Sequence, residues 1–304
     1  MERVIPILLI AVSASLWGMI AIFVRTLSDV GFTSMEIVTL RVVTALIILG
    51  MIGIFRYPKQ MKIKVSDVKL FVGTGILSIV FFNWCYFTSI NQLNLSFAVI
   101  LLYTSPAFVV ILSGIFLHER MNKKKLIAVI GTVTGCILIA GVSLNDTGTI
   151  NLAGLVTGLG AGLGYALYSI FGKFALNKYT PYTVTLYTFL IAAIALLPIT
   201  AIWEKARLLA NGEVLLYSVG LGLFPTVIAY ICYTKGLEKV ESSKAAIVAT
   251  VEPVVATILS VFLYQEGFGL LQFIGTTVII LSVILINLPK EFLGKRQREK
   301  ASIT

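Results

Sequence analysis

Residues 86–119 read YFTSINQLNLSFAVILLYTSPAFVVILSGIFLHE, and residues 233–266 read YTKGLEKVESSKAAIVATVEPVVATILSVFLYQE. The two segments align without a gap at an offset of 147 residues, with nine identities in 34 positions. The identical pairs are Tyr86 and Tyr233, Ser96 and Ser243, Ala98 and Ala245, Ile100 and Ile247, Pro106 and Pro253, Ile111 and Ile258, Leu112 and Leu259, Ser113 and Ser260, and Glu119 and Glu266. Because Tyr, Pro and Glu are uncommon in apolar helices, these matches indicate an internal duplication.

The composition is that of a membrane protein. Hydrophobic residues make up 58% of the chain and charged residues 12%, and the mean hydropathy is +0.98. A soluble domain carries about 25% charged residues. Because a spanning helix takes about 20 residues, the 304 residues accommodate ten spans with short connections and leave no separate soluble domain. The sequence therefore predicts an all-α, polytopic membrane protein with two halves, residues 1–145 and 146–304.

Ten apolar runs are predicted to form the spanning helices. Those of the first half cover residues 4–24, 36–55, 68–89, 96–117 and 125–142. Those of the second half cover residues 152–175, 180–203, 213–235, 243–264 and 267–288. Two five-helix repeats around a central cavity are typical of carriers that open to either side of a membrane in turn.

Lysine and arginine are distributed unequally between alternate connections. If the N-terminus is cytoplasmic, 20 of the 24 basic residues fall on the cytoplasmic side. They are Arg3, Arg56, Lys59, Lys62, Lys64, Lys69, Arg120, Lys123, Lys124, Lys125, Lys173, Lys178, Lys235, Lys239, Lys244, Lys290, Lys295, Arg296, Arg298 and Lys300. Arg25, Lys205 and Arg207 fall outside, and Arg41 lies within a span. Positively charged loops resist translocation, so we predict a cell-membrane protein with both termini in the cytoplasm.

Five spans in each half is an odd number, so the second half must cross the membrane in the opposite sense to the first. The fourth predicted helix then ends at Glu119 on the cytoplasmic side, and its partner, the ninth, ends at Glu266 on the outer side. The charges and the alignment independently favour an inverted repeat.

The charge balance and the cysteines indicate neither nucleic acid nor a metal. The net charge is +10 and the isoelectric point about 9.5, but the positive residues lie in loops between apolar segments rather than on one soluble face. Cys85, Cys136 and Cys232 fall inside apolar runs and lack the spacing of metal ligands. We therefore predict no nucleic-acid partner, no metal and no cofactor.

Short motifs in both halves resemble a known transporter family. The motifs are Leu16-Trp17-Gly18, Pro106, Leu117-His118-Glu119-Arg120, Glu252-Pro253 and Gln265-Glu266-Gly267. With the ten predicted spans, this pattern is similar to the EamA-like carriers of the drug/metabolite transporter superfamily. The resemblance implies secondary transport of small metabolites, most often export. It also implies a central cavity lined mainly by the first, third, fourth, sixth, eighth and ninth spans.

Glu252 is the residue most costly to place in a membrane. It follows Lys244 by eight residues, about 12 Å along a helix, which puts it close to the middle of the hydrocarbon core. An acid at this depth faces the bundle interior or a hydrated cavity and is a functional candidate. One interpretation is that it carries a coupling proton or holds a cationic group of the solute. The alternative is a packing residue that is neutral or hydrogen-bonded to a neighbour.

Pro106 and Pro253 occupy equivalent positions within their helices. Each lacks an N–H and frees the carbonyl four residues earlier, at Leu102 and Ala249. The resulting kinks are interpreted as hinges or packing devices in preference to direct ligands of a solute.

Three charged residues are candidates for gating or for orienting the helices. Arg41 would either attract an anionic group or extend outward to the membrane surface and orient its span, and the second interpretation is favoured. Glu119 and Glu266 close equivalent spans and would act either as gates that pair with basic residues or, more simply, as exposed polar helix ends.

Aromatic and polar residues supply candidates for the cavity wall. Rings that carry hydroxyl groups suit solutes with an apolar or cationic part. The alternative is that these rings face lipid or the membrane surface, as many do. The predicted lining residues are Trp17, Asn83, Trp84, Tyr103, Tyr165 and Tyr230, together with Glu252.

The expected function is export of amino-acid-like or other small polar or amphipathic solutes by alternating access, with a proton as the coupling ion that Glu252 suggests. The alternatives are a membrane-embedded enzyme, a channel or a structural membrane protein. His118, the one histidine, lies at a helix end and leaves an enzyme without an evident nucleophile and base pair. The expected partners are a small solute and membrane lipid. One chain supplies a complete ten-helix unit, so a homodimer is open but not indicated.

Overall fold

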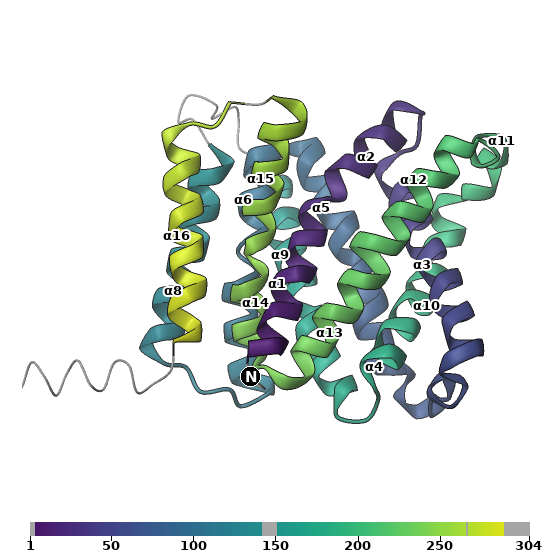
Figure 1. The fold of residues 1–304 in the computed structure, drawn as a ribbon, viewed down its shortest axis with the longest axis horizontal. Helices are drawn as coiled ribbons and strands as arrows, with labels where there is room; N and C mark the ends of the chain where they lie inside the picture. The colour runs from purple at the N-terminus through teal and green to yellow at the C-terminus, as the bar shows by residue number, and fades with distance from the viewer. Residues whose placement is uncertain (1–3, 142–150, 266, 289–304) are drawn as a thin grey trace, which may run out of the picture.

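The structure is a computed structural model that describes residues 4–141, 151–265 and 267–288 (Figure 1). These residues form helices and short connections and contain no strand. Within lipid every backbone N–H and C=O must be bonded inside the protein, which a helix achieves without a partner segment. The predicted all-α, polytopic membrane class is confirmed.

The first half forms eight α-helices and one π-helical stretch, Gly73–Val80. The α-helices are α1 (Val4–Gly18), α2 (Ile20–Asp29), α3 (Ser34–Arg56), α4 (Val68–Val72), α5 (Phe81–Gln92), α6 (Leu95–Leu102), α7 (Ser105–Phe116) and α8 (Lys123–Ala140). The second half forms α9 (Leu152–Leu176), α10 (Pro181–Thr200), α11 (Ala206–Leu209), α12 (Gly212–Gly222), the π-helical stretch Leu223–Ile228, α13 (Ala229–Lys239), α14 (Ser242–Ala249), α15 (Val251–Tyr264) and α16 (Leu270–Asn287).

Nine helical stretches among the described residues are long and apolar enough to cross a membrane. They coincide with nine of the ten predicted spans, and their ends differ from the prediction by a few residues. The remaining predicted span, the fifth (residues 125–142), forms α8, whose first three residues are lysines. A count of ten membrane crossings therefore stays a prediction.

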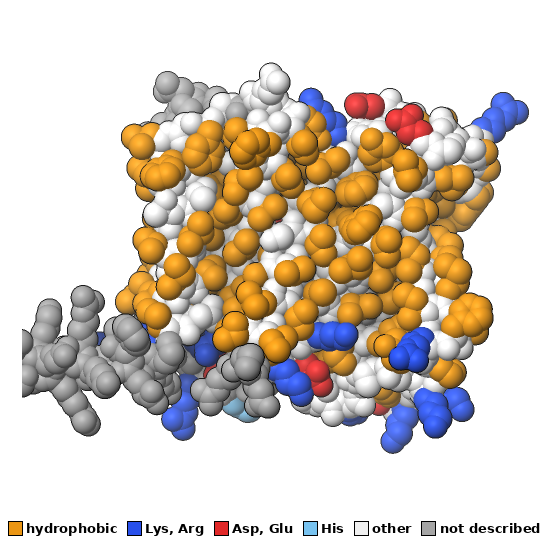
Figure 2. All heavy atoms as spheres, viewed as in Figure 1, with side chains coloured by type: hydrophobic (Ala, Val, Ile, Leu, Met, Phe, Trp, Pro, Cys, Tyr) orange, Lys and Arg blue, Asp and Glu red, His pale blue; other side chains and the backbone are white. Residues whose placement is uncertain are grey.

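Charged side chains gather at the two ends of the bundle. Figure 2 shows a broad belt of hydrophobic side chains, with most lysines and arginines at the end where the N-terminus lies. We call this the basic end and define it by the helix termini at Arg56, Lys123, Lys173 and Lys239. It is closed by contacts between the halves, such as the ion pair from Lys178 Nζ to Asp67 Oδ1 at 2.6 Å. The opposite end carries Lys205 paired with Glu36 at 2.6 Å.

Two helices are interrupted in the same way. α6 stops at Leu102 and α7 resumes at Ser105, while α14 stops at Ala249 and α15 resumes at Val251. A threonine at each break bonds a carbonyl of the preceding turn, Thr104 Oγ1 to Leu101 and Thr250 Oγ1 to Ile247, both at 2.6 Å. Pro106 and Pro253 follow the breaks, where a missing N–H leaves no helical bond unmade. The predicted interruptions are therefore present, and their role as hinges stays a prediction.

Other features recur between the halves. A π-helical stretch directly precedes α5 in the first half and α13 in the second half. A left-handed residue closes each broken helix, His118 with φ 54° and Gln265 with φ 55°. These matched features agree with the predicted duplication, which stays a prediction at the level of repeat boundaries.

Glycines let helices of opposite halves approach closely. A Cβ at Gly18 of α1 would lie 2.9 Å from the Glu252 carbonyl oxygen, and one at Gly162 of α9 would lie 2.8 Å from that of Leu101. Each break is thus covered by the first helix of the other half. α8 and α16 pack in the same manner, since a Cβ at Gly275 would lie 2.6 Å from the Gly135 carbonyl oxygen. α5 with α9 and α1 with α13 also pack extensively across the halves, as does α3 with α10.

Candidate functional site

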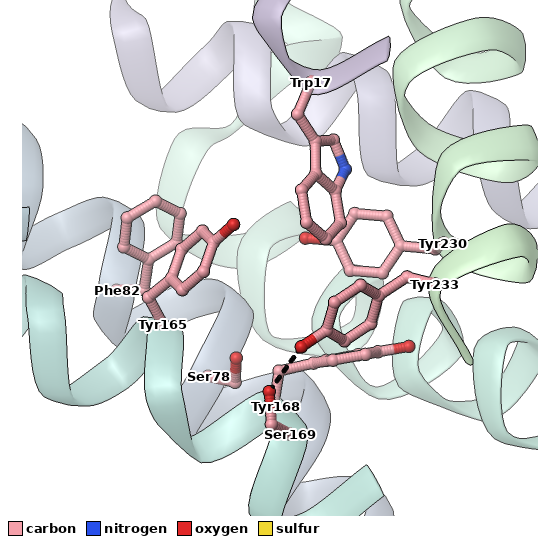
Figure 3. Close-up of a pocket in the computed structure, with 8 residues that line it drawn as sticks. All are labelled: Trp17, Ser78, Phe82, Tyr165, Tyr168, Ser169, Tyr230 and Tyr233. Atoms are coloured by element: carbon pink, nitrogen blue, oxygen red, sulfur yellow. Dashed lines mark hydrogen bonds between the residues drawn. The ribbon is translucent and has the colours of Figure 1, made fainter. Parts of the chain in front are cut away.

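An aromatic cluster lies where α1, α9 and α13 meet (Figure 3). The Trp17 ring centroid is 5.2 Å from those of Tyr230 and Tyr233 and 6.0 Å from that of Tyr165. Tyr168 stands edge-on to Tyr230 at 5.1 Å. Trp17 and Tyr230 are each only 7% exposed. The Leu-Trp-Gly motif therefore has a structural reason: Gly18 permits the close approach that places Trp17 in the cluster.

Hydrogen bonds fix two of these tyrosines. Tyr168 Oη and Thr234 Oγ1 are 2.8 Å apart, and Tyr233 Oη lies 2.7 Å from Ser169 Oγ, the bond drawn in Figure 3. Both tyrosine–partner pairs link α9 to α13, so the second half supplies a rigid wall for the cluster.

The cluster surrounds a small cavity. Its lining residues are Trp17, Ser78, Phe82, Tyr165, Tyr168, Ser169, Tyr230 and Tyr233. Its free volume is about 20 Å³, enough for a water molecule and too small for a metabolite. The conformation described here is therefore closed around this point.

Glu252 lies beside the cluster, in the first turn of α15. Tyr165 Oη donates a hydrogen bond to Glu252 Oε2 at 3.0 Å. The Tyr103 hydroxyl, at the break between α6 and α7, is a second hydrogen-bond partner. The side chain is partly buried. An acid is thus held by tyrosines from both halves beside the aromatic cavity.

Arg41 is also buried, with 6% of its surface exposed. Its guanidinium interacts with the Tyr230 hydroxyl and, electrostatically, with Glu252. Its Nε–H has no hydrogen-bond partner among the described residues. The favoured expectation that Arg41 extends outward to the membrane surface is therefore wrong, because its face of α3 is turned toward the interior.

The neighbours Asn83 and Trp84 have opposite environments. Asn83 is 4% exposed, and its Nδ2 donates to the Ile79 carbonyl of its own helix at 2.7 Å. Trp84 is 53% exposed and lies on the outer surface. Successive residues of a helix point about 100° apart, so burial of Asn83 turns Trp84 away. The prediction of Trp84 as a lining residue is wrong.

The sequence interpretation missed five lining residues. They are Ser78, Phe82, Tyr168, Ser169 and Tyr233. Two of them were detectable from spacing, since Tyr168 follows Tyr165 by three residues and Tyr233 follows Tyr230 by three. Residues three apart share one face of a helix, so paired tyrosines on two helices indicated a common aromatic wall.

Glu119 lies at the basic end and joins the two halves. Its carboxylate accepts hydrogen bonds from the backbone N–H groups of Ser242 and Ser243 at 2.6 and 3.2 Å, and from the Ser243 hydroxyl. Lys125 Nζ is 3.4 Å away. Burial raises the pKa of Glu119, but the bonds from the two serines and the Lys125 charge outweigh it and hold that pKa below its ordinary value.

The burial of Glu119 corrects the expectation that this residue is an exposed polar helix end. The Glu119 side chain is 9% exposed, so the interpretation of Glu119 as an exposed polar end is wrong. The corresponding expectation for Glu266 falls on a residue outside those described.

The comparisons with known proteins decide the family. The model of the EamA-like transporter family matches residues 4–141 and again residues 152–288. The chain belongs to the EamA-like transporter family. An uncharacterized transporter of Archaeoglobus fulgidus is 27% identical over 282 residues, covering 91% of this chain and 94% of that protein. The uncharacterized inner membrane transporter YicL of Salmonella typhimurium is 24% identical and covers 96% of this chain and 97% of its own length.

A solved crystal structure shares the fold of this EamA-like chain. The TM-score is 0.76 at 17% sequence identity, with 96% of this chain and 98% of the other covered. The likeness at this identity concerns the fold alone. The family match makes the protein a multi-pass membrane transporter whose partners are a small solute and membrane lipid.

Proposed function

We propose that this EamA-like transporter is a secondary carrier that exports small amino-acid-like solutes by alternating access. The observation that carries the proposal is that one cation and one acid, the buried Arg41 and the partly buried Glu252, lie beside the same aromatic cluster. Intramembrane charges are retained where they serve a solute or ion pathway. A solute that bears both charges and an apolar part matches all three kinds of group.

Each group offers a specific contact to such a solute. The guanidinium of Arg41 has an N–H without an acceptor among the described residues, and a carboxylate is the acceptor it suits best. Glu252 and the rings of Trp17 and Tyr230 suit an ammonium group. The two protein groups now interact electrostatically with each other, and a zwitterion would give each of them a direct partner.

The contacts at the two ends support alternating access. At the basic end, Glu119 ties α7 of the first half to the start of α14 of the second. At the other end, the Arg25 guanidinium lies 4.4 Å from the Tyr264 ring centroid and is solvent exposed. Opening either end requires one of these contacts between halves to break. The double family match supports two related halves, residues 1–145 and 146–304, that rock against each other.

Glu252 is the proposed coupling residue. A carboxyl group held by tyrosine hydroxyls can accept a proton when it faces one aqueous side and release it to the other. Binding of a proton and binding of the ammonium group of the solute would then compete at Glu252. The excess of lysine and arginine supports a basic end, with both termini, in the cytoplasm of the cell membrane.

Transport into proteoliposomes tests the proposal. Purified protein is reconstituted and offered radiolabelled amino acids, amines and sugars, each with and without a pH gradient. We expect saturable movement of at least one amino acid that the gradient accelerates. The Arg41→Gln variant should lose affinity for that solute. Movement of every solute at the rate of protein-free liposomes would contradict the carrier function.

A further inference from the structure

A large groove opens at the basic end, apart from the central cavity. Its lining residues are Ile5, Pro6 and Leu9 of α1, Pro181 of α10, and Lys235, Glu238 and Lys239 of α13. Its volume is about 760 Å³, within the range of sites that hold a small molecule. The central cavity is far smaller, so this groove has room for a ligand that the cavity lacks in this conformation.

The groove lies where the apolar belt meets the charged end. The side chains of Val4, Ile5 and Leu8, on the outer face of α1, are 55%, 57% and 56% exposed. Figure 2 shows hydrophobic side chains continuing upward from the first turn of α1, with lysines and an acid beside it below the belt. One wall thus faces the hydrocarbon region, and the mouth faces the level of lipid headgroups.

The charges at the mouth favour an anion. Lys235 and Lys239 lie one turn apart on α13 and are both exposed. Among the described residues Lys235 forms no ion pair, and Lys239 has only a 3.8 Å contact with Glu238. Two ammonium groups against one carboxylate leave a net positive site. Lysine binds phosphate as a point charge without demanding a fixed geometry.

Packing separates this groove from the solute site. A Cβ at Gly236 would lie 2.6 Å from the Pro6 carbonyl oxygen, so α1 and α13 are in backbone contact beside the groove. Ile10 and Leu237 are fully buried and Tyr233 is 2% exposed. These side chains fill the seam between the groove and the aromatic cluster, which argues against an entrance for the solute in this conformation.

We propose that the groove binds a membrane phospholipid with an anionic headgroup. Lys235 and Lys239 hold the headgroup phosphate, and the acyl chains follow the exposed face of α1 past Ile5 and Leu8. The bound lipid bridges α1 and α13, the two helices that carry Trp17 and Tyr230. Binding of an anionic lipid at this site therefore stabilises the closed arrangement of these helices.

Lipid retention tests the site. Protein reconstituted in nanodiscs of phosphatidylcholine with one fifth phosphatidylglycerol is extracted and analysed by native mass spectrometry. We expect the Lys235→Gln/Lys239→Gln double variant to retain phosphatidylglycerol at least about fivefold less than the wild type. The matched control is Lys59→Gln/Lys62→Gln, which removes the same charge from the same end at residues that do not line the groove and should stay within about twofold.

Two more measurements distinguish a bound lipid from a free phosphate and locate it on the protein. Glycerol phosphate added in place of the lipid should not raise the melting temperature, whereas phosphatidylglycerol should raise that of the wild type but not of the groove variant. A photoactivatable phosphatidylglycerol should label the wild type at the beginning of α1 or the end of α13. Equal lipid loss in both double variants, stabilisation by glycerol phosphate, or labelling confined to other helices would overturn the proposal.

Discussion

The two interrupted helices, α6–α7 and α14–α15, share one architecture and differ in chemistry. Both have a break, a threonine that bonds a carbonyl, and a proline after the break. At the offset of 147, however, Tyr103 corresponds to Thr250 and Ser105 corresponds to Glu252. The interrupted helix α6–α7 supplies the hydroxyl of Tyr103, and the interrupted helix α14–α15 supplies the acid Glu252. The shared positions build the scaffold, and the positions that differ supply the charge.

The helices beside them differ in the same manner. Asn83 of α5 corresponds to Tyr230 of α13 at the same offset. Asn83 bonds the Ile79 carbonyl of its own helix, whereas Tyr230 packs in the aromatic cluster and meets Arg41. A nearly symmetric fold therefore surrounds an asymmetric site, and substitutions at equivalent positions should have unequal effects.

The largest difference in transport is expected between substitutions of Glu252 and of Ser105, the residue at the equivalent position. Glu252→Gln keeps the size and the hydrogen bond from Tyr165 but removes the ionisable group. We expect pH-driven transport in proteoliposomes to fall at least about tenfold, because an intramembrane acid that serves a proton pathway loses that role when it cannot ionise. Ser105→Ala, the control at the equivalent position, should stay within about twofold. Unchanged transport by Glu252→Gln at every pH would contradict a functional difference between the interrupted helices α6–α7 and α14–α15.

The next effect concerns the contact of Glu119 with the start of α14. Glu119→Gln leaves Lys125 buried with only the exposed Glu241 as partner, and we expect a loss of about 2 kcal/mol in unfolding free energy. Glu241→Gln is the control, because its side chain is 49% exposed, and its loss should stay within about 0.5 kcal/mol.

The pH dependence of unfolding sharpens this test. Since the folded pKa of Glu119 lies below its ordinary value of 4.5, its stabilising contribution is complete above that value and is lost as pH falls through the folded pKa. Lowering the pH below 4.5 should therefore reduce the free energy of unfolding of the wild type more than that of Glu119→Gln, as measured by denaturant unfolding. Parallel pH curves for the two proteins would show that this carboxylate does not hold the halves together.

A smaller effect is expected for the tyrosine that holds the acid. Tyr165→Phe removes the donor to Glu252, and loss of a hydrogen bond to a charged group costs about 1.5 kcal/mol, or roughly tenfold in transport. Tyr168→Phe is the matched control, because that hydroxyl bonds Thr234 on α13 instead. Equal transport losses in both variants would indicate packing rather than control of Glu252.

The smallest effect is expected at Trp84. Trp84→Ala should leave transport within about twofold of the wild type, because exposed side chains away from a site contribute little. Trp17→Ala, the comparison within the cluster, should lower saturable uptake by more than twofold, since it removes a ring that contacts Tyr230 and Tyr233. A large loss at Trp84 would show that the outer surface of α5 takes part in transport.

Hydropathy and proline placement predicted the helices and their interruptions well. Lengths of apolar sequence and the missing N–H at Pro106 and Pro253 are local properties, and a helix in lipid obeys them without help from distant residues. Part of the site was also predicted from the sequence, since Trp17, Tyr165, Tyr230 and Glu252 come together in the structure.

Which face of a helix points inward was harder to predict. Hydropathy would bury Trp84 in preference to Asn83, the reverse of the structure, and depth along α3 does not show that Arg41 turns toward the interior. Long-range contacts could not be predicted from the sequence either. The hydrogen bond between Ser242 and Glu119, for example, joins residues that lie 123 positions apart. Such pairings depend on how helices rotate against each other, and packing of the whole bundle determines that rotation.

The glycine contact between α8 and α16 has a consequence for biogenesis. α8 closes the first half and α16 is the last helix described, so α8 gains this packing partner only after α9 to α15 have been made. Neither half can therefore mature alone during synthesis. The bundle acquires its final packing only when the last helix arrives.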